Sequence, residues 1–120
     1  MAYMLVVRQV EGGMPQTAEG KRVSADRMER MRGFGASLQA RGILKAADSL
    51  RSDSEGIRVE RRDGKLSFSD GPFTESKEII GGFFLIDVKT REEAVELATQ
   101  CPAAEWSTVE VRQCGPCYDP

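Results

Sequence analysis

Charged side chains concentrate in one short stretch of the chain, Asp70–Glu78. It opens with Asp70 and a Gly-Pro pair typical of a rigid turn, and Glu75, Lys77 and Glu78 follow closely. Two neighbouring carboxylates can hold different pKa values and divide the roles of general acid and general base. We therefore predict Asp70, Glu75 and Glu78 as candidate catalytic residues. Lys77 is a candidate for holding an anionic group of a substrate.

A structural interpretation of the same stretch stays open. Asp70 could cap backbone amides at the turn, and the other charges could form an exposed loop, because shifted carboxylates also occur in structural networks. The chain has no histidine, so the commonest general base near neutral pH and the commonest metal ligand are both missing. Acid–base chemistry would have to use carboxylates, Lys, Tyr or Cys. We predict no metal and no cofactor.

Aromatic residues and a glycine pair complete the predicted site. Tyr3, Phe73 and Trp106 could wall a pocket, and Gly81 and Gly82 lead from the charged stretch into an apolar strand. We predict these residues as ligand-binding, together with Lys77. The expected ligand is an unidentified small molecule.

The cysteines offer a second possible chemistry. Cys114-Gly-Pro-Cys117 has the spelling of a thioredoxin redox site, but that chemistry requires a helix N-terminus, and this motif follows the last predicted strand. We expect residues 114–120 to form a flexible tail. A regulatory disulfide and a four-cysteine zinc site between two chains are the alternatives. Cys101 lies on an apolar helical stripe and is predicted to be a core residue.

Length and composition limit the function classes. The 120 residues fit one domain, predicted at 1–113. A net charge of −2 does not suggest binding to nucleic acid or to an anionic membrane surface. No apolar run approaches the roughly 18 residues of a membrane span, and the N-terminus lacks the features of a secretory leader. An odd count of three cysteines argues against a disulfide framework. We expect a cytoplasmic protein.

Periodicity gives the order of the elements. A first helix is expected from an N-cap at Ser24 to about Arg41, with Gly42 ending it, and a second helix is expected from a capping box formed by Thr90 and Glu93. Arg27, Glu29, Arg30 and Arg32 are placed on the polar side of this helix, opposite its apolar residues. Gly33 and Gly35 are attributed to close packing of the first helix on a sheet. Strands are expected at 3–8, 43–50, 83–88 and 108–113.

A β-hairpin is predicted between the second and third of these strands. Asp63-Gly64 joins two alternating runs and is typical of a type I′ turn. Because one face of the alternation is polar, we place the hairpin towards the edge of a sheet. Arg58, Arg61 and Arg62 are interpreted as its solvated face.

This order fits an α+β ferredoxin-like sandwich, βαββαβ with an extra β-hairpin. The strands at 3–8 and 83–88 are apolar on both faces, which predicts the two central positions and cover on both sides. Two helices cover only one face of such a sheet. We therefore predict a homodimer whose sheets face each other, with a cavity between sheet and helices or between the two sheets.

The charged stretch also carries a resemblance. Asp70–Glu78 reads Asp-Gly-Pro-Phe-Thr-Glu-Ser-Lys-Glu and resembles the signature Asp-Gly-Pro-Phe-Ala-Glu-Thr-Lys-Glu of the YCII-related (DGPF domain) family. Flanking matches at Tyr3–Leu5, Gly81–Phe83, Cys101–Ala103 and Thr108–Arg112 extend the resemblance over most of the chain. Residues 9–24 and the tail after Gln113 are not covered.

The resemblance implies a dimeric α/β barrel built on the ferredoxin-like fold, in a superfamily with muconolactone isomerase-like and monooxygenase-like enzymes. Some relatives carry a His/Asp pair proposed as catalytic. Asp70 could match the aspartate, but this chain lacks the histidine. One hypothesis is therefore an isomerase or lyase that uses carboxylates. The alternative is a non-catalytic ligand-binding or regulatory dimer, linked to the extracytoplasmic-function sigma factors beside which some relatives are encoded.

Overall fold

The computed structural model describes residues 1–10, 15–73 and 78–118. In chain order the elements are β1 (Ala2–Val10), α1 (Ala18–Ala40), β2 (Leu44–Ser49), η1 (Asp53–Glu55), β3 (Ile57–Arg62), β4 (Lys65–Asp70), β5 (Glu78–Asp87), α2 (Arg91–Gln100), η2 (Pro102–Glu105) and β6 (Thr108–Gln113). No helix within these residues is long and apolar enough to cross a membrane.

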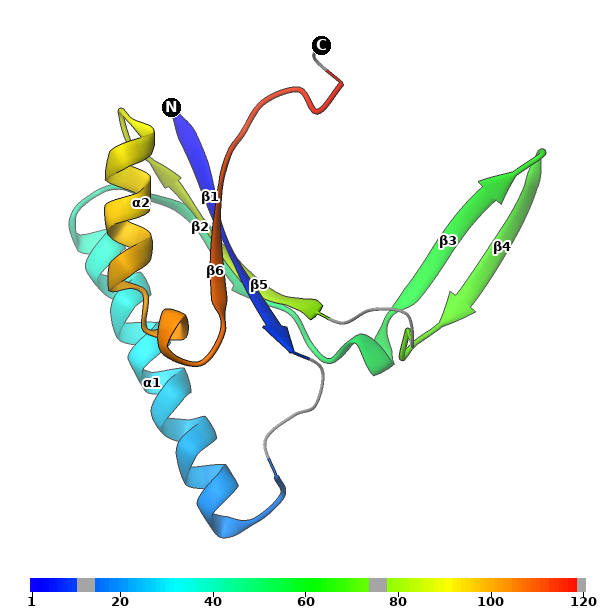
Figure 1. Ribbon diagram of the computed structural model, residues 1–120, viewed down its shortest axis with the longest axis horizontal. Helices are drawn as coiled ribbons and strands as arrows, with labels where there is room; N and C mark the ends of the chain where they lie inside the picture. Colours follow the sequence, from blue (N-terminus) through cyan, green and yellow to red (C-terminus); the bar gives the residue numbers. More distant parts are fainter. Residues whose placement is uncertain (11–14, 74–77, 119–120) are drawn as a thin grey trace.

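The main sheet has the strand order β2-β5-β1-β6, and every neighbouring pair in it is antiparallel. The two strands that are apolar on both faces, β1 and β5, occupy the central positions, as predicted. With α1 and α2 added (Figure 1), this arrangement confirms the α+β class and is that of a ferredoxin-like sandwich.

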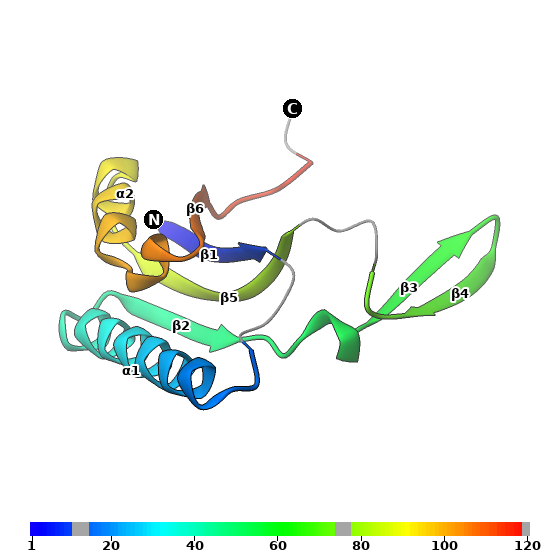
Figure 2. The same ribbon diagram turned by 60° about the horizontal axis from the view of Figure 1, so that its bottom comes forward.

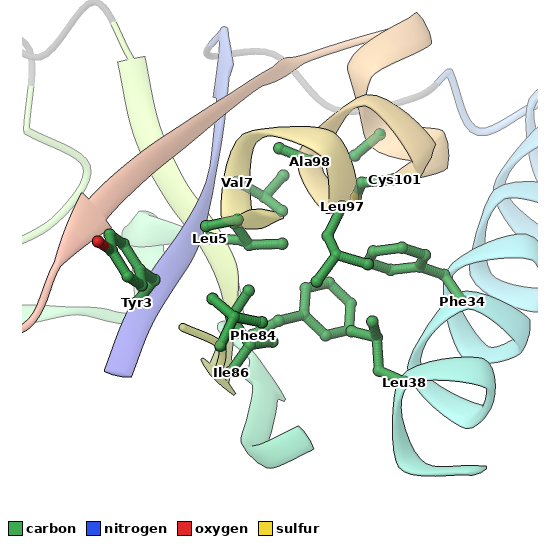
Figure 3. Packing of buried hydrophobic residues seen from close by; sticks show 13 residues of the cluster. Tyr3, Leu5, Val7, Phe34, Leu38, Phe84, Ile86, Leu97, Ala98 and Cys101 are labelled. Atoms are coloured by element: carbon green, nitrogen blue, oxygen red, sulfur yellow. The ribbon is translucent and has the colours of Figure 1, made fainter. Parts of the chain in front are cut away.

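The core lies between the two helices and one face of this sheet. Alternate residues of the central strands point into it, among them Leu5 and Val7 of β1 and Ile86 of β5. Phe34 of α1 meets Phe84 of β5 edge to face, with ring centroids 5.1 Å apart (Figure 3). This is a favourable geometry for an aromatic pair. Cys101 is also buried here, at 2% exposure, which confirms its assignment to the core.

The opposite face of the sheet carries no helix of the described chain. We call it the open face, and its centre is formed by two cross-strand pairs, Met4 with Leu85 and Val6 with Phe83. Val6 is buried by its neighbours and the other three are half-buried. An ion pair between Arg8 and Glu110, at 3.5 Å, flanks this apolar centre.

The hairpin forms a separate two-stranded sheet, β3–β4, that projects away from the body (Figures 1 and 2). We call it the arm. Asp63 and Gly64 have φ values of 52° and 77°, which confirms the predicted type I′ turn. The prediction that the hairpin lies at the edge of a larger sheet is wrong. Side chains on both faces of the arm are exposed, because it leaves the main sheet altogether.

The first helix begins earlier than predicted. It starts at Ala18, and Ser24 lies inside it, because the Thr17 hydroxyl accepts a hydrogen bond from the Gly20 amide at 3.0 Å and caps the helix. Its end is as predicted, with Gly42 in the left-handed region at φ 74°. The packing interpretation holds for Gly35, where an added Cβ would lie 3.4 Å from the Phe84 ring. It is wrong for Gly33, where an added Cβ would meet nothing within 4 Å.

The second helix, α2, and the strand before it, β5, differ from the predictions in detail. The Thr90 hydroxyl accepts from the Glu93 amide at 3.2 Å, as expected. The Glu93 carboxylate, however, accepts from the Lys89 amide and not from the Thr90 amide. β5 begins at Glu78 rather than at Phe83, because a bulge near the glycine pair lets the strand continue pairing with the end of β1.

Candidate functional site

The charged stretch is described only in part. Asp70 ends β4 and is exposed, and its carboxylate makes no hydrogen bond or ion pair with the described residues. Glu75 and Lys77 lie outside the described residues. Glu78 begins β5 opposite Val10, but the structure describes only its backbone. The predicted convergence of these carboxylates therefore stays a prediction.

The turn that opens this stretch is packed tightly against η1. The Gly71 amide donates to the Gly56 carbonyl at 2.9 Å. A Cβ on Gly71 would lie 1.8 Å from the Asp53 carbonyl oxygen, a distance that no side chain can occupy. Gly71 is therefore required by close approach of backbone to backbone. The Gly71-Pro72 peptide bond is cis.

One cleft lies at this turn, where the arm joins the body. We call it the elbow cleft, and its volume is about 640 Å³. The Arg58 guanidinium lies over the Phe73 ring, with its central carbon 3.7 Å from the ring centroid. The Asp53 Oδ2 atom is buried without a hydrogen-bond partner among the described residues. The lining residues are Arg8, Leu50, Arg51, Ser52, Asp53, Glu55, Gly56, Ile57, Arg58, Phe73, Ile79 and Ile80.

A second cleft lies between α1, the sheet and η2. We call it the helix cleft, and its volume is about 470 Å³. Its walls are mostly apolar, and its charged groups are Arg27 and Arg32 of α1 and Asp48 of β2. The lining residues are Val7, Gln9, Arg27, Met28, Met31, Arg32, Gly35, Ala47, Asp48, Ser49, Gly81, Gly82, Phe83, Phe84, Ala103 and Trp106.

The glycine pair gives the helix cleft part of its shape. A Cβ on Gly81 would lie 3.0 Å from the Gln9 side chain, and a Cβ on Gly82 would lie 2.8 Å from the Asp48 carbonyl oxygen. Larger residues would therefore push β5 away from β2 or from the Gln9 side chain. The pair keeps β2 close to β5 and leaves the end of the cleft open.

Trp106 closes the cleft where η2 ends. The Arg27 guanidinium lies 4.7 Å from the Trp106 ring centroid, and that of Arg30 lies 5.3 Å away. Arg27 lines the cleft, whereas Arg30 does not. Arg30 instead pairs with the Glu105 carboxylate, which raises the pKa of Arg30. The two arginines thus share one ring but differ in their access to the cleft.

The structure distributes the predicted ligand-binding residues over three places. Gly81, Gly82 and Trp106 line the helix cleft, and Phe73 lines the elbow cleft. Tyr3 lies in the core at 3% exposure, and it lines neither cleft. Asp70 lies outside both clefts.

Sequence reasoning missed the charged groups of the helix cleft. Arg27 was placed with the solvated side of the helix, yet Arg27, Met31 and Gly35 all line the cleft. Their spacing of four residues puts them in one row along α1, and this row is the signal that could have identified Arg27. The sequence offered no such signal for Asp48. This residue lies on β2, which the structure shows to be exposed for most of its length.

The described residues offer guanidinium groups and thiols as chemical groups. They contain no group of three or more His, Cys, Asp or Glu side chains placed to hold a metal ion. Cys101 is buried, and burial raises the pKa of its thiol above the usual value, which disfavours the thiolate. Cys114 and Cys117 are free and exposed beyond β6. Arginine guanidinium groups recognise carboxylate and phosphate oxygens, and two of them line the helix cleft.

Comparison with known protein families gives a match over nearly the whole chain. The family model for the YCII-related domain matches residues 1–116. Comparison with curated proteins finds no relative of this chain.

Proposed function

The chain belongs to the YCII-related domain family, and from this premise we propose that it binds a small apolar molecule with one anionic group in the helix cleft. The observation that carries the proposal is the pairing of an apolar cavity with Arg27 and Arg32. Small-molecule sites are typically concave, mostly apolar and equipped with a few polar groups that fix orientation. A volume of about 470 Å³ lies within the usual range for such sites.

The position of Arg27 supports an anionic rather than a neutral ligand. Its guanidinium is held against Trp106, so less side-chain freedom is lost when it meets an anion. Asp48 lines the same cleft and disfavours a second anionic group nearby. The ligand class that fits both is a monoanion with an aryl or alkyl body.

Catalysis has less support from the described residues. Asp48 is the described carboxylate that lines the helix cleft, and Asp70 lies outside it. The isomerase or lyase hypothesis therefore depends on Glu75, Lys77 and Glu78. Binding is the function that the described geometry supports.

A homodimer is the second part of the proposal. The centre of the open face is formed by large apolar side chains, and its two strands are apolar on both sides. The radius of gyration is 16.5 Å, whereas a compact domain of this length has about 13.6 Å. Such an extended shape is more typical of a subunit in an oligomer than of a compact monomer. Sedimentation equilibrium should give twice the monomer mass of 13.2 kDa at micromolar concentration, and a monomer there would contradict the dimer.

A thermal-shift screen with matched pairs tests the ligand class. The probes are aryl and alkyl carboxylates, such as 3-phenylpropionate and octanoate, each beside its neutral amide. A probe at 100 times its Kd stabilises the protein by about 2.7 kcal/mol. We expect at least one carboxylate to raise Tm clearly more than its amide. Equal shifts for acids and amides, or no shift from any carboxylate, would contradict the proposal.

A further inference from the structure

The arm has one apolar side and one polar side. The apolar side carries Ile57, Val59, Leu66 and Phe68, which are 63%, 59%, 51% and 67% exposed. Two charged residues lie at its ends, Arg61 opposite Leu66 and Asp70 opposite Ile57. Val59 and Phe68 face each other across the two strands. The polar side carries Arg58, Glu60, Arg62, Lys65, Ser67 and Ser69. Such alternation is typical of a sheet with one covered face and one wet face.

No described element of the same chain covers the apolar side. The arm projects from the body, and the chain extends over 48 × 47 × 19 Å (Figure 2). A lone two-stranded hairpin is marginally stable in water, and it needs packing against another surface. The apolar side therefore needs a second surface to cover it.

The apolar side of the arm continues into the open face of the sheet. Ile57, at the base of the arm, lines the elbow cleft together with Leu50 and Ile80. Ile80 pairs with Arg8 across β5 and β1, and Arg8 in turn pairs with Glu110 on the open face. Leu50 and Ile80 are themselves 56% and 49% exposed. Apolar residues thus lead from the arm, through the elbow cleft, to Ile80 on the open face, where the Arg8–Glu110 ion pair borders them.

We propose that the arm of one protomer lies over a second copy of this chain, with its apolar side against that copy. This inference rests on the homodimer proposed above. The elbow cleft joins Ile80, which lies on the open face, to Ile57 at the base of the arm, so a second copy seated on the open face lies next to the arm. A two-fold axis uses the same surface of both copies, so each arm would cover part of the other protomer.

The amount of apolar surface supports a second copy as the occupant. A stable interface buries about 800 Å² per partner. The centre of the open face supplies little of this, because Val6 is buried and Met4, Phe83 and Leu85 are half-buried before any partner binds. The arm adds four large side chains that are each more than half exposed. Sheet and arm together form a far larger interface than the sheet does alone.

Photo-crosslinking from the arm tests this inference. Benzoylphenylalanine is placed at Phe68 on the apolar side and, as the matched control, at Ser67 on the polar side. Protein with the probe is mixed with ¹⁵N-labelled protein, subunits are exchanged, and crosslinked peptides are identified by mass spectrometry. We expect crosslinks between labelled and unlabelled chains from position 68, and few or none from position 67.

The possible results separate this inference from the dimer on which it rests. A dimer in sedimentation whose position 68 crosslinks only within its own chain, or no more than position 67 does, overturns the arm contact and leaves the dimer standing. A monomer in sedimentation overturns both. Neither result bears on the helix cleft, which the thermal-shift screen tests separately.

Substitution gives a second readout that needs no crosslinker. Val59→Ser combined with Phe68→Ser removes the apolar pair from the exposed side of the arm, and Glu60→Ser combined with Lys65→Ser is the matched change on the polar side. We expect the first pair to raise the dimer dissociation constant at least about tenfold and the second pair to change it less than about twofold. Equal effects of the two pairs would overturn the inference. Circular dichroism checks that both variants keep the fold.

Discussion

The guanidinium carbon of Arg27 lies 4.7 Å from the centroid of the Trp106 ring, which joins α1 to the end of η2 at the helix cleft. Trp106 is the one tryptophan of the chain, so its fluorescence reports on this cleft alone. The stacked guanidinium places a positive charge beside a mostly apolar cavity. This pair is the basis of the proposed specificity for an organic anion.

Introducing a negative or a positive charge at Met28 should change the affinity for carboxylates in opposite directions. Met28 lines the helix cleft but is 62% exposed, so charged replacements there leave the core intact. We expect Met28→Glu to weaken carboxylate binding by about 3–10-fold through like-charge repulsion in partial solvent, and Met28→Lys to preserve or strengthen it. Quenching of Trp106 fluorescence measures both affinities. The same affinity in both variants would show that the anionic group lies elsewhere.

Substitution at Gly71 should destabilise the protein. The Cβ of Gly71→Ala would lie 1.8 Å from the Asp53 carbonyl oxygen, and both groups belong to the backbone, so the turn must move. We expect a loss of about 1–3 kcal/mol in the free energy of unfolding, measured in urea at one protein concentration. Gly115→Ala is the control, because its Cβ would meet nothing within 4 Å. A Gly71→Ala variant as stable as wild type would contradict the tight packing of the turn against η1.

Substitution of Gly33 by alanine should stabilise the protein, in contrast to the substitution at Gly71. Gly33 lies inside α1 and is exposed, and an added Cβ would meet nothing within 4 Å. Glycine in a helix interior is less favourable than alanine by roughly 0.5–1 kcal/mol. We expect Gly33→Ala to raise the free energy of unfolding by about this amount in the same urea assay. A loss of stability would indicate a contact at Gly33 that the described structure lacks.

The three cysteines should differ in reactivity towards a thiol reagent. Cys101 is 2% exposed, and burial raises the pKa of its thiol, whereas Cys114 and Cys117 are exposed. Only the thiolate reacts. In the native protein at pH 8 we expect two thiols to react rapidly with Ellman's reagent and the third only after unfolding. Rapid reaction of all three would contradict the buried position of Cys101.

The same burial makes stability depend on pH at the alkaline end. The pKa of Cys101 is higher in the folded than in the unfolded chain. Its contribution to the free energy of unfolding is therefore complete below the unfolded pKa of about 8.5, and this contribution is lost as pH rises through the folded pKa. The free energy of unfolding should therefore fall more steeply between pH 8 and pH 10 in wild type than in Cys101→Ala. Equal slopes would show that Cys101 ionises equally in both states.

The framework of the fold could be predicted because its signals are local and strong. Apolar residues at both parities identified β1 and β5 as central strands, and Asp63-Gly64 identified the hairpin turn. The start of α1 escaped prediction, because Thr17 caps a first turn of polar residues that resembles a loop. The separation of the arm also escaped it, since alternation indicates that one face is covered but does not indicate what covers it.

The candidate site was predicted less well for a different reason. Arginines beside an amphipathic stripe are normally assigned to solvent, and this rule placed Arg27 on the wet side. Its long apolar stem can instead lie along a surface while the charge reaches an aromatic ring. Whether that happens depends on Trp106, which is far away in sequence and close only in the fold. The glycine pair and Trp106 were predicted as ligand-binding residues from their residue types. Their contacts in the fold could not be predicted in the same way.

Isothermal titration of two arginine variants tests the central claim most directly. Arg27→Met and Arg30→Met each remove a guanidinium from the Trp106 ring, but only Arg27 lines the helix cleft. The titrants are the tightest-binding carboxylate of the thermal-shift screen and its neutral amide. We expect Arg27→Met to raise the Kd of the carboxylate at least about tenfold, equivalent to 1.4 kcal/mol, and to leave that of the amide within about twofold. Arg30→Met should leave both within about twofold of wild type. Equal losses in the two variants, or a carboxylate that binds Arg27→Met as tightly as wild type, would contradict an anion site at Arg27.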